Sequence, residues 1–204
     1  MSAVAWLINS PRRIQAIIEE QRPDHRKCRL FAVARCRGWW DKIVDPTSRE
    51  LIDLTEQFID DRRLESRLTK LRRAVHRWAK TIWNTPKWPK DWIAHWAAWN
   101  AAVPAILPPC FGYFSSDDGY RTIAADIFGN PFRSVVFDPR WRSESAVALA
   151  RTAYDTRDFA LLPILADALE EAGCDHPDVL THCRDPQQVH VRGCWVVDGV
   201  LGRS

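Results

Sequence analysis

Apolar residues recur every three or four positions along most of the chain, which is the period of a helix that buries one face. The most regular stretch is 64–82, where the apolar positions alternate steps of four and three residues. These positions are Leu64, Leu68, Leu71, Val75, Trp78 and Ile82. Only residues 134–138 have the character of a short strand, and we interpret them as extended chain lying on the helices. The sequence therefore predicts an all-α fold, a compact bundle of about eight or nine helices.

Capping residues predict where several helices begin and end. Asp45-Pro46 places a capping side chain before a proline, whose fixed backbone suits the first helical position. Gly129 and Gly173 suit helix C-termini, because glycine adopts the left-handed conformation found there. We expect helices at about 11–21, 24–44, 46–60, 64–82, 116–129 and 163–173, with two short ones at about 177–184 and 191–201.

The net charge changes sign along the chain. Residues 1–100 hold 20 lysines and arginines against 12 acidic residues, whereas 101–204 hold 9 against 14. The change coincides with a stretch rich in proline and glycine that begins at Pro104. We expect a basic, tryptophan-rich N-terminal half, 1–107, packed on an acidic short-helix half, 108–204, in one compact unit. Opposite charges would let the two halves attract each other.

The composition is that of a globular protein, with 46% hydrophobic and 27% charged residues. No run approaches the roughly 20 apolar residues that a membrane-spanning helix needs, so we expect no membrane partner. The first residues lack the charge order and cleavage pattern of a secretory signal, and we therefore expect a cytoplasmic protein. In that compartment the six cysteines would be reduced thiols rather than disulfides.

The helix around 62–82 carries a basic face opposite its apolar seam. Its cations are Arg62, Arg63, Arg67, Lys70, Arg72, Arg73, Arg77 and Lys80. Such a face can neutralise phosphates and release their counterions, so nucleic-acid binding through Arg67, Arg72, Arg73 and Arg77 is one hypothesis. The alternative is a solvated or intramolecularly paired face, because exposed helices commonly carry such charge and no recognition motif accompanies this one.

Tryptophan is unusually frequent, with 11 in the chain. Trp88, Trp92, Trp96 and Trp99 follow one another at helical spacing and would share one face of a helix at about 89–103. Indoles bury large apolar areas in cores and interfaces, so this stripe predicts an interaction surface for a protein partner or a second copy. Burial in the chain's own core and a stacking platform for bases or sugars are the alternatives.

Three of the six cysteines and three of the six histidines lie within 174–194. Zinc prefers four nitrogen or sulfur ligands, which Cys174, His182 or Cys183, His190 and Cys194 could supply. His190 and Cys194 would share a helical face, whereas the adjacent His182 and Cys183 point about 100° apart, so at most one of them would bind. The alternative is that these residues only pack or form local hydrogen bonds, since their spacing departs from common zinc motifs.

The sequence offers little support for a group of catalytic residues. Cys194, His190 and Asp198 would line up along one helix, but parallel side chains do not converge on a substrate as a nucleophile and its base must. The chain has no phosphate-binding glycine loop, no Gly-x-Ser-x-Gly elbow and no His-Glu-x-x-His pair. We therefore expect a protein that is not an enzyme.

Several segments of the chain are similar to one bacterial family. They are WL at 6–7, RLFAVA at 29–34 with CR at 36–37, DIFGNPFR at 126–133, FDPRW at 137–141, LADALEEAGC at 165–174 and HVRGCWVVD at 190–198. Together they resemble an uncharacterised family of paralogous proteins that is numerous in planctomycete bacteria. The resemblance covers both ends of the chain and leaves about 60–115 unmatched. It implies a bacterial, cytoplasmic protein and no particular reaction.

Taken together, these patterns predict a non-catalytic helical module that binds an unknown protein partner or a second copy of itself. Nucleic-acid binding through the helix at 62–82 and a structural zinc site at 174–194 are the alternatives. Zinc is the one cofactor that the sequence suggests.

Overall fold

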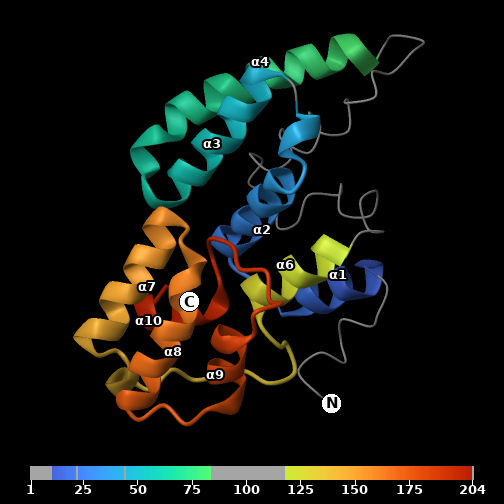
Figure 1. Cartoon of the computed structure of the whole chain (residues 1–204). Helices are drawn as coiled ribbons and strands as arrows, with labels where there is room; N and C mark the ends of the chain where they lie inside the picture. The colour runs from blue at the N-terminus through green and yellow to red at the C-terminus, as the bar shows by residue number, and fades with distance from the viewer. Residues whose placement is uncertain (1–10, 22, 44, 84–117, 204) are drawn as a thin grey trace. The chain divides into compact units, whose positions relative to one another are not determined.

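The computed structural model describes residues 11–21, 23–43, 45–83 and 118–203. Within these residues the protein has nine α-helices, several short 3-10 turns and no β-strand, which confirms the predicted all-α class (Figure 1). In the same residues no helix is long and apolar enough to cross a membrane. The chain divides into two compact units, the first within Pro11–Tyr120 and the second from Arg121 onward. The boundary predicted at 107 lies outside the described residues.

The first unit contains α1 (Pro11–Glu20), α2 (His25–Arg37), α3 (Pro46–Asp60) and α4 (Glu65–Trp83). The start of α3 follows its sequence signal, because the Asp45 carboxylate accepts a hydrogen bond of 2.7 Å from the Ser48 N–H. The end of α2 differs from the expected position near 44. The helix stops before Gly38, a poor helix former whose N–H bonds to the Ala34 carbonyl, and a 3-10 turn at Trp40–Lys42 follows.

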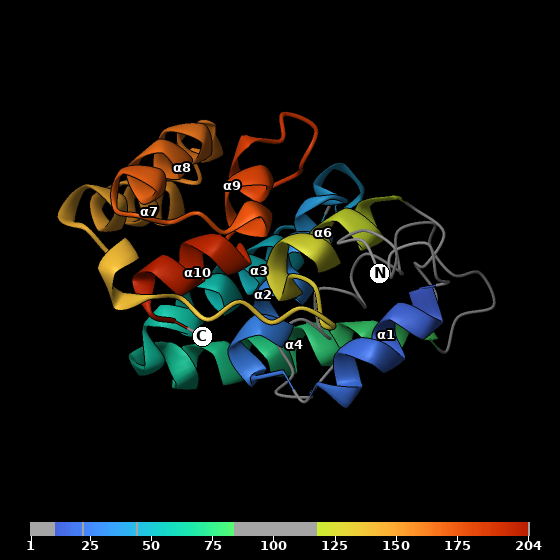
Figure 2. The ribbon, with the colours of Figure 1, turned by 90° about the horizontal axis from the view of Figure 1, so that it is seen from below.

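The helices α3 and α4 lie side by side in the first unit (Figures 1 and 2). Their contact is built on the predicted seam, since Leu68 and Val75 of α4 pack with Leu51, Leu54 and Phe58 of α3. These side chains are nearly or fully buried. The apolar side of α4 is therefore used within the first unit.

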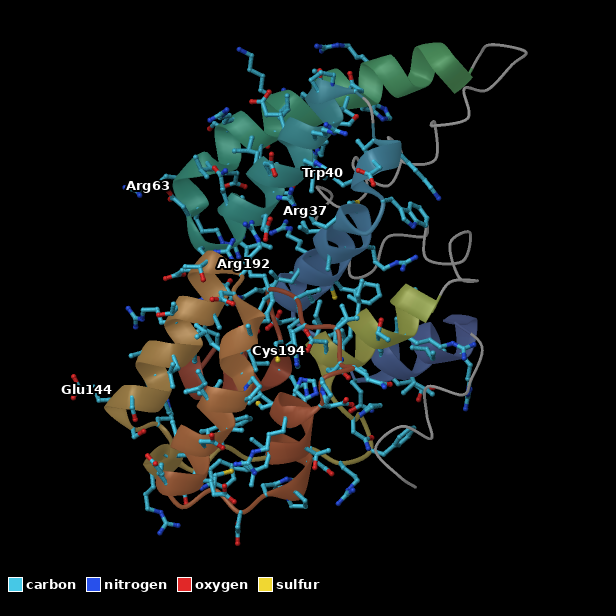
Figure 3. All side chains as sticks on the ribbon, viewed as in Figure 1. Arg37, Trp40, Arg63, Glu144, Arg192 and Cys194 are labelled. Carbon is cyan, nitrogen blue, oxygen red and sulfur yellow. The ribbon has the colours of Figure 1, made fainter. Side chains whose placement is uncertain are left out.

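The second unit contains α7 (Glu144–Thr156), α8 (Leu162–Glu171), α9 (Pro177–Arg184), α10 (Trp195–Leu201) and most of α6 (Asp118–Phe128). α7 packs against α8 and α10, and α8 packs against α9. Their shared core includes Tyr154, Leu162, Leu165, Leu169, Val179, Val196 and Val197. Cys194 lies in the interior of this unit, whereas Glu144 points away from α7 into solvent (Figure 3).

The extended segment before α7 passes directly against α10. Residues 134–138 form neither helix nor strand, and the Phe137 ring packs against the rings of Trp141 and Trp195 at centroid distances of 5.9 and 6.0 Å. A side chain at Gly199 would collide with this ring, because an added Cβ would lie 2.2 Å from Phe137 Cε2. Gly199 therefore allows the close approach that holds α10, the helix that Cys194 precedes.

We expect the substitution Gly199→Ala to lower the free energy of unfolding by about 1–3 kcal/mol, the usual cost of forcing extra volume into a packed contact. Urea denaturation followed by circular dichroism would measure it. Gly38→Ala is the matched control, because a Cβ there meets its nearest atom at an ordinary 3.5 Å. Equal stability of Gly199→Ala and the unsubstituted protein would contradict the packing described here.

Candidate metal centre

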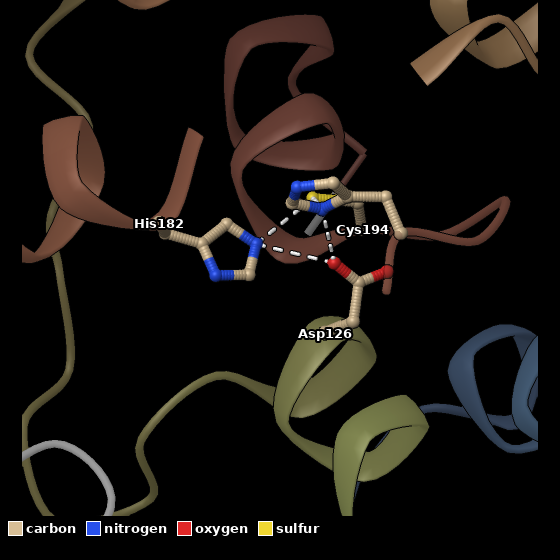
Figure 4. A group of neighbouring side chains, drawn as sticks. Asp126, His182 and Cys194 are labelled. Carbon is tan, nitrogen blue, oxygen red and sulfur yellow. Dashed lines mark hydrogen bonds and ion pairs between the residues drawn. The ribbon is translucent and has the colours of Figure 1, made fainter. Parts of the chain in front are cut away.

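Four polar side chains from separate parts of the second unit meet in its interior. Asp126 comes from α6, His182 from α9, His190 from the connection between α9 and α10, and Cys194 from the N-cap position of α10. Each offers one ligand atom, and these four atoms lie within 4.8 Å of one another. Figure 4 shows Asp126, His182 and Cys194 pointing toward one another.

The ligand atoms lie close to one another. Asp126 Oδ1 lies 2.8 Å from His190 Nδ1 and 3.2 Å from His182 Nε2. Cys194 Sγ lies 3.3 Å from His182 Nε2 and 4.0 Å from His190 Nδ1. Zinc bonds of about 2.0–2.3 Å in a tetrahedron would place ligand atoms roughly 3.3–3.8 Å apart. The observed separations bracket that range, so small shifts would fit the four atoms to one ion.

A tight turn brings His190 and Cys194 to the same side. The Cys194 N–H bonds to the Val191 carbonyl at 3.0 Å, and Gly193 has a positive φ of 99°, which a side chain would disfavour. His190 lies in this connection and not on α10, which begins at Trp195. The line of His190, Cys194 and Asp198 along one helix, considered from the sequence, therefore does not form.

The Asp126 carboxylate is oriented by a hydrogen bond outside the cluster. Its Oδ2 atom accepts a bond of 2.8 Å from the Val191 N–H, which leaves Oδ1 directed at the two imidazoles. Partners of this kind, beyond the ligands themselves, fix ligand orientation in metal sites. The turn that positions His190 thus also positions the carboxylate.

The cluster is closed to solvent. The side chains of Asp126 and Cys194 are fully buried, and those of His190 and His182 are 7% and 11% exposed. The Trp195 ring lies 5.2 Å from the His182 ring, which makes one wall of the cluster apolar. Four protein ligands and little access for water are the marks of a structural zinc site, whereas catalytic sites keep a position open.

Buried charge makes a cation favourable here. Burial alone would raise the pKa of Asp126, but hydrogen bonds and charge from His182 and His190 outweigh it and lower that pKa below the usual range. Burial, followed by the Asp126 charge, raises the pKa of Cys194 well above that of an ordinary thiol. Among the described residues no lysine or arginine pairs with Asp126. A divalent ion would compensate the carboxylate and convert the thiol to a thiolate ligand.

The arrangement does not suit a cysteine nucleophile. In such sites the base uses its two ring nitrogens for two partners, the nucleophile on one side and the orienting carboxylate on the other. Here the same atom, His182 Nε2, faces both Cys194 Sγ and Asp126 Oδ1. Cys194 is also fully buried, which leaves a substrate no route to the sulfur in this conformation.

The other two predicted zinc ligands lie in apolar surroundings. Cys174 and Cys183 belong to the hydrophobic core of the second unit and are not among the four converging groups. Burial raises the pKa of Cys183 to about 12. Of the adjacent pair, only His182 therefore joins the cluster.

Sequence reasoning missed Asp126. The available signal was its position on α6, three residues after Ile123 and next to Ile127, both of which are buried. A carboxylate on the apolar face of a helix requires a partner in the interior. Its partners are far away in sequence, so spacing within 174–194 could not reveal it.

The remaining predicted sites are distributed over the first half of the chain. Arg67 forms an ion pair of 2.8 Å with Glu50, Arg72 is half-buried, and Arg73 and Arg77 are exposed. The interaction stripe of Trp88, Trp92, Trp96 and Trp99 lies outside the described residues. It stays a prediction.

Comparisons of the chain with protein-family profiles, curated proteins and solved structures found no match. The resemblance to a planctomycete family therefore stays a prediction, as does the expectation that the protein is not an enzyme.

Cobalt(II) offers a direct test of the ligand geometry, because it replaces zinc and reports its ligands through visible and near-ultraviolet absorption. We expect the cobalt protein to show tetrahedral bands and a thiolate-to-cobalt charge-transfer band that Cys194→Ser removes. Cys183→Ala is the control and should keep the charge-transfer band. Loss of the band in Cys183→Ala together with its retention in Cys194→Ser would refute the assigned ligand set.

Proposed function

We propose that this chain is a zinc-binding helical protein whose metal ion holds the second unit together through Asp126, His182, His190 and Cys194. The observation that carries the proposal is the convergence of four ligand atoms, one from each residue, within 4.8 Å in a closed interior. Three of these residues lie within 182–194, but Asp126 precedes His190 by 64 positions. The ion would thus link α6 to residues 182–194, which come much later in the chain.

The donor set favours zinc over the other common metals. Magnesium and calcium prefer oxygen ligands, so one sulfur and two nitrogens argue against both. Two histidines and one carboxylate also bind non-haem iron, but those sites leave positions open for oxygen and substrate. Here Cys194 supplies a fourth ligand, and the cluster is buried. A tetrahedral zinc ion with a structural role is the best fit.

A structural site is compatible with the expectation of a non-catalytic module. With four protein ligands, the ion would have no free position at which to activate water or bind a substrate. We therefore propose that zinc stabilises the second unit and that the protein acts by binding a protein partner or a second copy of itself.

Metal content and stability test the zinc site together. Untagged protein purified without chelator should contain about one equivalent of zinc, measured by elemental mass spectrometry. Removing the metal should lower the thermal midpoint, since a ligand at 100 times its Kd adds about 2.7 kcal/mol of stability. Asp126→Asn should lose the zinc, because the amide keeps the shape of the side chain but not its charge.

The control for this experiment is Asp167→Asn, which removes an exposed carboxylate paired with Arg184 and should keep the metal. Chelator should destabilise the unsubstituted protein and this control but leave Asp126→Asn unchanged. Metal-free protein of full stability would reject the proposal.

A further inference from the structure

The basic residues of α4 and of the 3-10 turn that precedes it, Arg62–Leu64, separate into two groups of cations in the structure. Arg63 and Arg67 are exposed but paired, with Asp61 and Glu50 respectively, each at 2.8 Å. Arg63 points away from the ribbon in Figure 3. These two arginines already have carboxylate partners, so they are less available to bind an external anion.

The second group forms a stripe along one side of α4. Lys70, Arg73 and Arg77 are exposed, and in the described parts of the chain no carboxylate forms an ion pair with them. They line a surface hollow together with Ser66 and Thr69, which follow the same helical spacing. Glu65 lies at one end of the hollow and is its one acidic lining residue in the described chain. Within the described residues, the stripe is thus a line of three cations without an ion-pair partner and two hydroxyl groups.

This set differs from the one predicted from sequence. Arg67 is paired with Glu50, and Arg72 is half-buried. The structure therefore replaces Arg67 and Arg72 with Lys70 as a candidate contact.

The spacing of the stripe suits a phosphate backbone. Residues 70–77 span about 10.5 Å at 1.5 Å per residue. Over that length one strand of duplex DNA carries about three phosphates. Hydroxyl groups such as those of Ser66 and Thr69 commonly donate hydrogen bonds to phosphate oxygens. Three cations and two donors on one rigid face therefore match a short stretch of backbone.

Other polyanionic partners fit this surface less well. A helix that lies on a membrane inserts an apolar face into the lipid, but the apolar face of α4 is packed against α3 through Leu68 and Val75. The centres of protein interfaces are depleted of charge and enriched in aromatic residues, whereas the hollow is lined by charged and hydroxyl side chains. We propose that Lys70, Arg73 and Arg77 of α4 bind the sugar-phosphate backbone of nucleic acid independently of base sequence.

Fluorescence anisotropy with the full chain and a labelled mixed-sequence DNA duplex tests the proposal between 50 and 200 mM salt. The variant K70Q/R73Q/R77Q should bind roughly tenfold or more weakly at low salt. The slope of log affinity against log salt should fall by about two to three, since each phosphate contact contributes about 0.9. The charge-conserving variant K70R/R73K/R77K should bind like the unsubstituted protein.

The matched control is R63Q/R67Q/R140Q, which removes three exposed arginines that are each paired with a carboxylate. It has the same net charge as the test variant and should retain most of the affinity. An equal loss in both variants would overturn the proposal in favour of a net-charge effect. Undetectable binding at 50 mM salt, or equal binding to polyglutamate or to anionic lipid vesicles, would also overturn it.

Discussion

The buried carboxylate of Asp126 is the constraint on which the second unit depends. A fully buried negative charge is tolerated only where partners offset the cost of removing it from water. Two imidazoles and one backbone N–H provide these partners, and all three come from 182–191. The positions of these three groups relative to α6 are therefore fixed by the need to contact the carboxylate. The contact of Gly199 with Phe137 contributes by fixing α10, which follows Cys194 directly.

The fold class and several helix ends could be predicted because they are set by local chemistry. The apolar seam of α4 and the Asp45-Pro46 cap act within a few residues of the chain, and both appear in the structure. The predicted end of α2 near 44 was wrong. The apolar period continues past Gly38, but the helix stops there. A periodic pattern shows which face is buried more reliably than where a helix ends.

The candidate site was only partly predictable, because one of its four ligands, Asp126, is distant in sequence from the other three. The angle between neighbouring helical residues indicated that His182 and Cys183 could not both bind, and they do lie in different surroundings. The turn at 191–194 brings His190 and Cys194 together without the helix expected there. Asp126 reaches the cluster through the tertiary fold, which no spacing rule within 174–194 describes. The same is true of α4, where Arg67 pairs with Glu50, whereas Lys70, Arg73 and Arg77 form no ion pair among the described residues.

The distance in sequence between Asp126 and His190 also affects how the protein is made. At a synthesis rate of about 5–20 residues per second, the 64 positions between them take roughly 3–13 s to translate. During that interval the imidazole partners of the Asp126 carboxylate have not been synthesised. Burying the apolar face of α6 would then leave the carboxylate charge uncompensated. The helices α7 and α8 can meet as soon as both have left the ribosome. We therefore expect α6 to keep its carboxylate in water until residues 182–194 emerge, so that it is synthesised early in this unit and reaches its final place late.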